Sequence, residues 1–480
     1  MTGLFHDSRQ VQPGGLYFAL KDGRYVNEAV QKGAVVVVTE DSTVQVPDNV
    51  VLIITENVRS IMALAAKDFY GNIVDKMRVT AVVGTNGKTT TTYIMSHILE
   101  KATGKKVGLI GTTGIFNAGE CWKDVITLTT PDPIDLHKAF SDMYANGVRD
   151  VVMEVSAHAI HYHKIDGINF AGVIFTNITQ DHLDFFETFE QYKDTKISFF
   201  RHLQTGNVIV NADDKYGKDV ADVLSAQPNV FTVGYSLNHN CIESADHWTY
   251  VESVQMSVKG SDFILGKLGE CFLSLPGLYN VYNAVAAALL SHRYGVTWNI
   301  IKESLATVPS VPGRFNLYQV NGISVIIDYA HTPDGLSQLL QNARAIMPQE
   351  RKLFVVFGCG GDRDRIKRPE MGRIAYRLAD YVVLTSDNPR TEDPDVIIDE
   401  IERGIITMGT HELGLYLDGK ISKRYTRITD RTEAIKYAIK QASCGDLVVI
   451  AGKGHENYME INHEKIPYMD SKVLDNILRG

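Results

Sequence analysis

Short apolar runs alternate with longer segments of helical hydrophobic period along most of the chain. A run rich in β-branched residues indicates a buried strand, because both faces of such a strand must be covered. Strands that alternate with helices build parallel sheets with helices on both faces, so the expected fold class is α/β. The expected strands are 35–39, 50–54, 79–83, 107–110, 150–153, 172–176, 208–211, 324–327, 353–357, 381–385 and 446–451.

Two polar breaks divide this alternating pattern into three parts. The first, residues 71–76, precedes the strand at 79–83, and the second, residues 308–313, holds two prolines before a new series of strands. A chain of 480 residues suits two to four domains, at roughly 150 residues each. We expect three domains, at 1–75, 76–310 and 311–480, of which the first is small.

Charge and cysteine content exclude several classes of partner. The net charge is −9 and the pI is about 5.9, which argues against a surface for nucleic acid or anionic membranes. The five cysteines are scattered without a C-x-x-C pair, as expected for reduced thiols and not for a disulfide framework or a zinc site. No run approaches about eighteen apolar residues, so no membrane insertion is expected. We expect a cytoplasmic monomer that binds small anions.

A glycine turn separates the strand at 79–83 from a helix expected to begin near Lys88. The first N–H groups of a helix are unpaired and carry positive potential, so such a turn favours phosphate. Lys88 would reach the terminal phosphates, and the hydroxyl of Thr89 or Thr90 would meet Mg²⁺. The general pattern G-x-x-x-x-G-K-[ST] needs glycine where Val82 stands, and glycine turns also occur without nucleotide. The residues expected at the nucleotide are Gly84, Thr85, Asn86, Gly87, Lys88, Thr89 and Thr90.

Two polar residues follow other expected strands of the central domain. Glu154 comes after the run at 150–153 and is a candidate Mg²⁺ ligand, because ligands bind at the carboxyl ends of strands in open α/β sheets. The alternative is a carboxylate that caps the next helix. His182 follows the strand at 172–176 and is either a metal ligand or an ordinary histidine at a helix terminus. Mg²⁺ prefers oxygen ligands, which counts against the metal interpretation.

Three loops with glycine or proline follow apolar strands in the last third of the chain. They carry Arg363, Arg390 and Glu456. Loops that follow parallel strands meet at one edge of the sheet, so these charges are expected to form one pocket for a substrate with both charge signs. The alternative is a set of solvated charges on separate loops.

Eleven ordered motifs resemble the Mur ligase family, and within it the UDP-N-acetylmuramoyl-tripeptide synthetases. They are DSR at 7–9, GTNGKTTTT at 84–92, TTPDP at 129–133, MEVSAHA at 153–159, NITQDHLDF at 177–185, GLYNVYNAVAA at 277–287, PGRFN at 312–316, DYAHTPDGL at 328–336, GGDRD at 360–364, DNPR at 387–390 and GKGHE at 452–456. The resemblance implies a shortened N-terminal UDP-sugar-binding domain, a central ATP-binding domain with a P-loop ATPase-type parallel sheet, and a C-terminal Rossmann-like domain that binds the amino acid. The implied activity is that of an ATP-dependent amide ligase. A carboxylate of a UDP-sugar peptide attacks the γ-phosphate, and an amino acid then displaces phosphate from the acyl phosphate.

The resemblance also implies roles for single residues. Thr89 or Thr90 with Glu154 would hold the first of two Mg²⁺ ions, and His182 the second. Lys196 matches the lysine that the family carbamylates, and a carbamate is an oxygen donor suited to Mg²⁺. The implied catalytic residues are Lys88, Glu154, His182 and Lys196, and further contacts to ATP come from Asn280, Arg314, Asp328 and His331. The UDP-N-acetylmuramoyl dipeptide would contact Ser8, Thr129, Thr130, Ser156 and Lys164, with Ser8 nearest the uridine.

The DNPR motif resembles the signature of members that add meso-diaminopimelate. Arg363 and Arg390 would clamp the distal carboxylate of this amino acid, and Glu456 would pair with its distal ammonium. Lysine has no distal carboxylate and would leave buried guanidinium groups unpaired, so it should be rejected. The implied contacts in this domain are Arg363, Asp387, Asn388, Pro389, Arg390, Gly452 and Glu456.

Three departures from the family pattern concern the UDP-sugar end. The first domain is short, and segment 19–26 lacks much of the family's glycine–histidine stretch. Ala157 replaces a common serine, and Lys164 replaces a common arginine, which keeps the charge but loses the bidentate fork. The alternatives are a lysine-adding or specialised Mur-type peptide ligase, a folylpolyglutamate-synthetase-like ligase, a phosphotransferase that stops at the phosphorylated product, and an inactive nucleotide-binding homologue.

Overall fold

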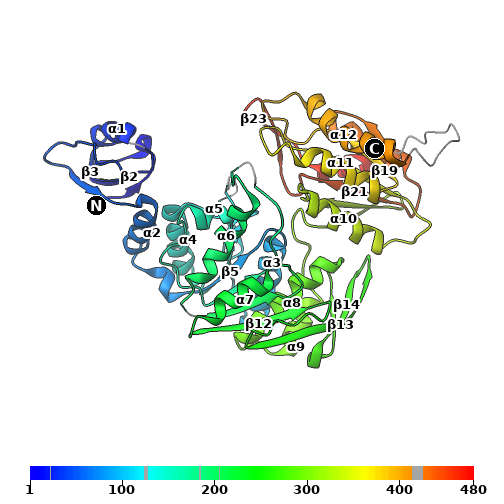
Figure 1. Ribbon diagram of the computed structural model, residues 1–480, viewed down its shortest axis with the longest axis horizontal. Coiled ribbons are helices and arrows are strands. Elements are labelled where there is room, and N and C mark those ends of the chain that lie inside the picture. Colours follow the sequence, from blue (N-terminus) through cyan, green and yellow to red (C-terminus); the bar gives the residue numbers. More distant parts are fainter. Residues whose placement is uncertain (22, 124–127, 183–184, 205, 413–424, 480) are drawn as a thin grey trace.

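The computed structural model describes residues 1–480 except 22, 124–127, 183–184, 205, 413–424 and 480. Figure 1 shows three units in a row along the molecule, with the N-terminal unit at one end, the C-terminal unit at the other and the central unit between them. Each unit contains its own sheet. The domain boundaries that we place after residues 75 and 310 fall between these sheets and stay predictions.

A four-stranded parallel sheet in the order β1-β2-β3-β4 forms the N-terminal unit. Tyr17 and Val37 on one face belong to the core that includes residues of α1, and Phe18 and Val38 on the other face pack with α2. This alternation follows from the two-residue period of a strand. The elements are β1 (Leu4–Phe5), β2 (Gly15–Ala19), α1 (Val26–Gln31), β3 (Ala34–Thr39), β4 (Val51–Ile54) and α2 (Val58–Phe69).

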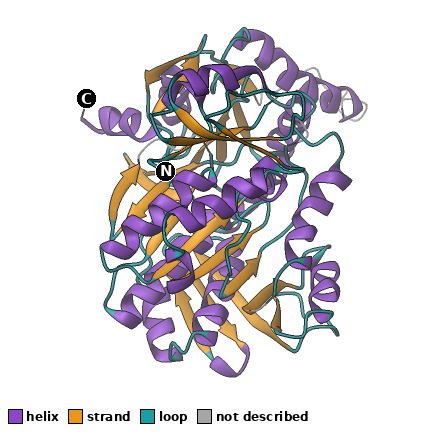
Figure 2. Ribbon diagram, turned by 90° about the vertical axis from the view of Figure 1, so that its left-hand side faces the viewer, coloured by secondary structure: helices purple, strands orange, loops and turns teal. Residues whose placement is uncertain are grey.

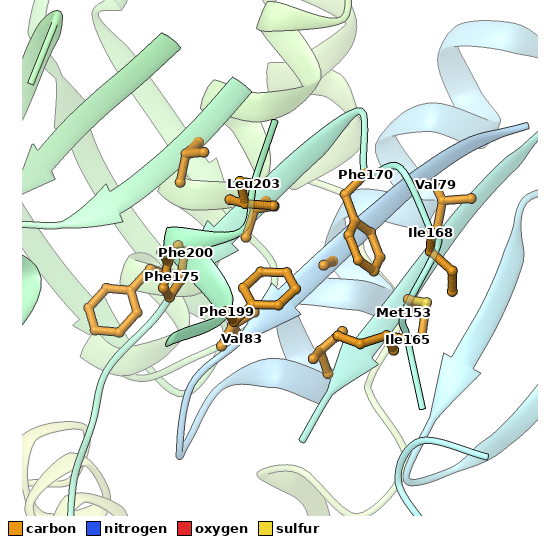
Figure 3. Close-up of a cluster of buried hydrophobic side chains, with 14 of the residues drawn as sticks. Val79, Val83, Met153, Ile165, Ile168, Phe170, Phe175, Phe199, Phe200 and Leu203 are labelled. Atoms are coloured by element: carbon orange, nitrogen blue, oxygen red, sulfur yellow. The ribbon is translucent and has the colours of Figure 1, made fainter. Parts of the chain in front are cut away.

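An eleven-stranded sheet forms the central unit, in the order β15-β14-β13-β12-β11-β10-β5-β9-β6-β7-β8. Figure 3 shows one face of it, where Val79 and Val83 of β5 lie in one hydrophobic cluster with Phe170 and Phe175. Val82 points to the opposite face and belongs to a second cluster, which includes residues of α3 and α8. Two covered faces explain why the central strands are continuously apolar.

The two edges of the central sheet consist of antiparallel strands, of which the apolar pattern predicted only β6. β13, β14 and β15 pair antiparallel at one edge, as do β6, β7 and β8 at the other. Because much of β13 is exposed, it lacks a continuous apolar run. The elements are β5 (Arg78–Val83), α3 (Lys88–Thr103), β6 (Gly108–Gly111), β7 (Gly114–Asn117), β8 (Glu120–Lys123), α4 (Pro133–Ala145), β9 (Asp150–Val155), α5 (Ala157–His161), β10 (Gly172–Phe175), α6 (Phe189–Arg201), β11 (Gly206–Asn211), α7 (Gly217–Ser225), β12 (Val230–Ser236), β13 (His247–Ser257), β14 (Gly260–Leu265), β15 (Glu270–Leu273), α8 (Leu278–Arg293) and α9 (Trp298–Leu305).

A six-stranded sheet in the order β16-β17-β21-β18-β19-β20 forms the C-terminal unit. All its pairings are parallel except that of β16 with β17. The elements are β16 (Asn316–Val320), β17 (Ile323–Asp328), α10 (Pro333–Ala345), β18 (Leu353–Phe357), α11 (Lys367–Leu378), β19 (Tyr381–Leu384), α12 (Pro394–Glu412), β20 (Tyr425–Arg427), α13 (Arg431–Gln441), β21 (Leu447–Ala451), the hairpin of β22 (Tyr458–Ile461) and β23 (Glu464–Pro467), and α14 (Asp470–Arg479).

The predicted α/β class is confirmed, and each expected strand is present within two residues of its predicted ends. Figure 2 shows the strands of the larger sheets lying among helices, as parallel sheets require. Within the described part of the chain, no helix has the length and apolar character needed to cross a membrane.

Candidate active site

The glycine loop lies at the carboxyl end of β5, and α3 begins at Lys88 as the spacing predicts. Gly87 caps this helix with a φ of 86°. A β-carbon on Gly87 would lie 2.4 Å from Asn283 Oδ1, and one on Gly84 would lie 1.9 Å from Thr176 Oγ1. Only glycine fits at either position, so the loop lies tightly against the neighbouring segments.

Lys88 folds back onto the loop that it follows. Its ammonium donates to the carbonyl oxygens of Gly84 and Thr85 at 2.9 and 2.8 Å. Burial lowers the pKa of Lys88, while the carboxylates of Glu154 and Asp181 oppose that shift. The amine therefore braces the loop and lies in the electrostatic field of two acidic groups.

Glu154 lies on β9 and is only 1% exposed. Its Oε1 accepts hydrogen bonds from the Thr89 hydroxyl and the Thr112 amide, both at 2.9 Å. Its Oε2 accepts one from the Thr112 hydroxyl at 3.0 Å. The helix-cap interpretation of Glu154 is wrong, because Ser156 caps α5 by accepting from the Ala159 amide. A carboxylate beside hydroxyls is a set of hard oxygen donors, which fits Mg²⁺.

A cavity of about 290 Å³ lies beside the loop, between the central and C-terminal units. It includes most of the residues expected at the nucleotide: Asn86, Gly87, Thr89, Thr90, Arg314 and Asp328. Asn280 lies outside its wall, because the side chain is buried and donates to the Pro276 carbonyl at 2.7 Å. Asn283, one turn further along α8, lines the cavity instead.

Two contacts join the C-terminal unit to the glycine loop. Arg314 Nη2 donates to Thr89 Oγ1 at 3.3 Å, and Asn86 Nδ2 donates to Asp334 Oδ2 at 2.8 Å. Burial raises the pKa of Asp334. Sequence reasoning did not single out Asp334, although it stands in the DYAHTPDGL motif. The cavity beside the glycine loop is therefore lined by residues from both units.

Another acidic residue missed from the sequence is Asp213. Its Oδ2 accepts from the Tyr282 hydroxyl and the Leu237 amide, both at 2.7 Å, and its Oδ1 accepts from the Ser236 hydroxyl at 2.6 Å. Asp213 thereby fixes the segment after β12, whose Asn238 lines the cavity. Its position just after β11 would have marked it by the rule that ligands bind at strand ends.

A second cavity, of about 410 Å³, opens between the same two units. Its central-unit wall includes Thr129, Thr130, Ser156, Lys164 and His182. Its C-terminal wall includes His331, Arg363, Asp387, Asn388, Arg390, Gly452 and Glu456. The structure thus brings the three charged loops of the last third together, whereas Pro389 is not among the lining residues.

Ser8 lies apart from both cavities. Its hydroxyl donates to Glu28 Oε2 at 2.6 Å within the N-terminal unit, and its side chain is buried. Neither cavity includes Ser8 in its wall. Lys164 by contrast is buried at the second cavity, where its ammonium forms an ion pair with Asp132 at 2.9 Å.

His182 lies close enough to Lys196 to be affected by the charge of that side chain. His182 has a φ of 54° and lies 3.4 Å from Asp181 Oδ2 through its Nε2. Burial lowers the pKa of His182, which favours the neutral imidazole that binds metals. Leu183 and Asp184 of the same motif lie outside the described residues.

Lys196 is 1% exposed on α6. Among the described residues it forms no ion pair, and its nitrogen lies 4.8 Å from the centre of the Tyr192 ring. Burial and the charge of Lys88 lower the pKa of Lys196 well below its usual value. The uncharged amine is thereby favoured, and this is the form that reacts with carbon dioxide to give a carbamate.

Arg390 already has partners within the protein. Its Nε donates to Glu460 Oε2 at 3.1 Å and its Nη1 to the Gly361 carbonyl at 2.7 Å. The expectation that lysine would leave this guanidinium unpaired is therefore wrong for Arg390. Glu460 belongs to β22, a strand that the apolar pattern did not predict.

The α/β fold, the glycine loop at the carboxyl end of β5 and the two cavities between units are typical of a nucleotide-binding enzyme. The family model described as "Mur ligase middle domain" matches residues 82–291, and that described as "Mur ligase, glutamate ligase domain" matches residues 313–454. The chain belongs to the Mur ligase family.

The similarity to individual members extends over the whole chain. The UDP-N-acetylmuramoyl-L-alanyl-D-glutamate--2,6-diaminopimelate ligase of Clostridium tetani is 38% identical over 100% of this chain and 95% of its own length. The protein of the same name from Geobacillus thermodenitrificans is 40% identical over 98% and 94%. A solved structure of a ligase with this name superimposes with a TM-score of 0.68 at 30% identity, covering 99% of this chain and 94% of that one.

Proposed function

We propose that this chain is an ATP-dependent amide ligase that joins meso-diaminopimelate to UDP-N-acetylmuramoyl-L-alanyl-D-glutamate. The second cavity carries the proposal, because Thr130 of its central wall donates to the Glu154 carbonyl at 3.0 Å while the opposite wall presents Arg390 and Glu456. A substrate carboxylate and an amino acid with both charge signs can therefore meet beside the nucleotide. The names of relatives that match end to end support this choice of substrates.

The reaction proceeds in two balanced steps. The D-glutamyl carboxylate attacks the γ-phosphorus of ATP, and the bond from this phosphorus to the β-phosphate oxygen breaks. The products of this step are an acyl phosphate and ADP. The uncharged amine of the amino acid then attacks the acyl carbon, phosphate leaves, and the amine loses a proton to solvent. The N-terminus of α3 and Lys88 stabilise the transferring phosphoryl group, and Lys164 attracts the substrate carboxylate.

The oxygen donors beside the loop are suited to two Mg²⁺ ions. Glu154 with Thr89 or Thr90 would hold one ion, and His182 with a carbamate on Lys196 would hold the other. When bound, Mg²⁺ neutralises the phosphate charge that repels the incoming carboxylate. The burial of Lys196 supports carbamylation, because a buried amine loses its proton more readily and a carbamate brings oxygen donors.

The C-terminal wall of the second cavity would select the amino acid. Arg390 and Arg363 would receive the distal carboxylate, and Glu456 the distal ammonium. Enclosure between two units also keeps water from the acyl phosphate, so we expect the units to close during turnover.

The test is phosphate release and product mass with ATP, Mg²⁺ and UDP-N-acetylmuramoyl-L-alanyl-D-glutamate. Three reactions are compared, with meso-diaminopimelate, with L-lysine and without amino acid. We expect the tripeptide to form much faster with meso-diaminopimelate than with L-lysine, and no amide without amino acid. A faster reaction with lysine would keep the ligase activity and overturn the assignment of the amino acid. A phosphorylated product without any amide would indicate a phosphotransferase, and no turnover would indicate an inactive homologue or another carboxylate substrate.

A further inference from the structure

Two of the charged groups on the C-terminal wall of the second cavity form ion pairs with residues that do not line it. Arg390 lines the cavity and pairs with Glu460 at 3.1 Å, and Glu456 lines it and pairs with Lys453 at 2.8 Å. Glu460 and Lys453 are not among the lining residues. The Lys453 side chain is 0% exposed and that of Glu460 is 23% exposed. Two counter-charges therefore lie behind two wall charges.

Asn388 links the two ion pairs into one network. Its Nδ2 donates to Glu456 Oε2 at 2.9 Å, and its Oδ1 accepts from Lys453 Nζ at 3.0 Å. The same Oδ1 accepts from the Glu460 amide at 2.9 Å. These bonds join the wall residues Asn388 and Glu456 to each other and to Lys453 and Glu460 behind them, so the two pairs are held in a fixed relation.

The hairpin of β22 and β23 holds Arg390 in place through its backbone as well. The Arg390 amide donates to the Glu460 carbonyl at 3.0 Å, and the Asn462 amide donates to the Arg390 carbonyl at 2.8 Å. These bonds stabilise the φ of 52° that Arg390 adopts, a conformation unfavourable for a residue with a side chain. Glu460 thus fixes both the backbone and the guanidinium of Arg390.

We infer that Glu460 and Lys453 are positioning residues that determine specificity. They balance the charges of Arg390 and Glu456, so that the wall prefers an amino acid whose distal end is zwitterionic, with one carboxylate and one ammonium and no net charge. This inference rests on the proposed function, because it concerns the amino-acid end of the same cavity. With both counter-charges present, Arg390 and Glu456 each attract one group of the ligand without a large net potential. Loss of one counter-charge gives the wall an excess of one sign, and the preferred head group changes accordingly.

The two losses have opposite consequences. Without the negative charge of Glu460, the wall gains positive potential. The relative kcat/KM should then rise for an amino acid with only a distal carboxylate and fall for one with only a distal ammonium. Without the positive charge of Lys453, the preference reverses. At the separations of these pairs a single charge changes the relative kcat/KM by at least about tenfold.

The experiment compares three amino acids by kcat/KM: meso-diaminopimelate, 2-aminopimelate, which lacks the distal amine, and L-lysine, which lacks the distal carboxylate. The variants are Glu460→Gln and Lys453→Met, with Glu464→Gln as the matched control on exposed β23. Relative to meso-diaminopimelate, Glu460→Gln should favour 2-aminopimelate and disfavour lysine, each by about tenfold. Lys453→Met should do the opposite, and Glu464→Gln should change neither ratio. The KM for ATP should stay constant throughout.

Ratios that stay at the wild-type values in a folded Glu460→Gln protein would overturn the inference. Shifts of both ratios in the same direction, or an equal shift in the KM for ATP, would also overturn it, because they would indicate a merely structural role. If the Lys453→Met protein does not fold because Lys453 is buried, the Glu460→Gln protein alone still tests the inference. A wild-type protein that forms product with none of the three amino acids would instead refute the proposed function, and this inference with it.

Discussion

Asp470→Asn should destabilise the C-terminal unit more than any single surface change. Asp470 and Arg431 form an ion pair in which both side chains are 0% exposed. The Arg431 Nε and Nη2 atoms donate to the two Asp470 oxygens at 2.8 and 2.9 Å. The same guanidinium donates to the Ser386 carbonyl at 3.3 Å and the Ala451 carbonyl at 3.0 Å. Asparagine keeps one acceptor but removes the charge that compensates Arg431.

Removal of one partner from a buried ion pair costs about 3–5 kcal/mol, because the other charge stays buried without compensation. Amide exchange limited by unfolding should then be at least about 10²-fold faster in the core strands. Ser386 and Ala451 stand directly before the loops of Asn388 and Glu456. The KM for the amino acid should therefore rise more than the KM for ATP.

Hydrogen exchange followed by mass spectrometry over β18 and β21 measures this change in the C-terminal unit alone. The control is Glu433→Gln, which removes the exposed partner of Lys436 and should leave the exchange unchanged. A double variant, Arg431→Met with Asp470→Leu, should regain much of the lost stability, because it removes both charges. Exchange in Asp470→Asn within threefold of wild type would refute the reasoning.

Three further predictions concern the central unit. Burial lowers the pKa of His137 from 6.5 to about 4. As the pH falls from 6.5 towards 4, His137 therefore gains a proton in the unfolded state but not in the folded state. The free energy of unfolding should therefore drop by about 2 kcal/mol more between pH 7.5 and 5 in wild type than in His137→Phe; equal drops would contradict this. Gly87→Ala should raise the KM for ATP at least about tenfold by displacing Asn283. Gly104 also has a left-handed backbone, but its β-carbon would point into open space, so Gly104→Ala should leave the KM for ATP unchanged. Equal effects of the two variants would show that backbone strain causes the change. Lys196→Ala should lose turnover and regain part of it with short carboxylic acids in place of the carbamate; a folded variant that no acid rescues would count against carbamylation.

The sequence by itself determined the class of the fold and the phosphate loop. Continuous apolar runs such as that of β5 identify strands covered on both faces, and a glycine turn followed by Lys88 marks the start of α3. These features depend on residues close together in the chain, because strand period, helix period and the φ of glycine are local properties. The resemblance to the Mur ligase family was likewise visible in the sequence, because eleven of the family's motifs occur along the chain in the same order.

Only the tertiary structure decided which charged groups face one another. Arg390 and Glu460 are 70 residues apart in the chain, and Glu154 meets Thr112 from 42 residues away. The structure also placed Asn283 rather than Asn280 in the wall of the cavity beside the glycine loop, and Ser8 outside both cavities. A hydrogen bond or ion pair needs atoms within about 3–4 Å. Such proximity between distant segments depends on how the sheets and loops pack, which no local period specifies.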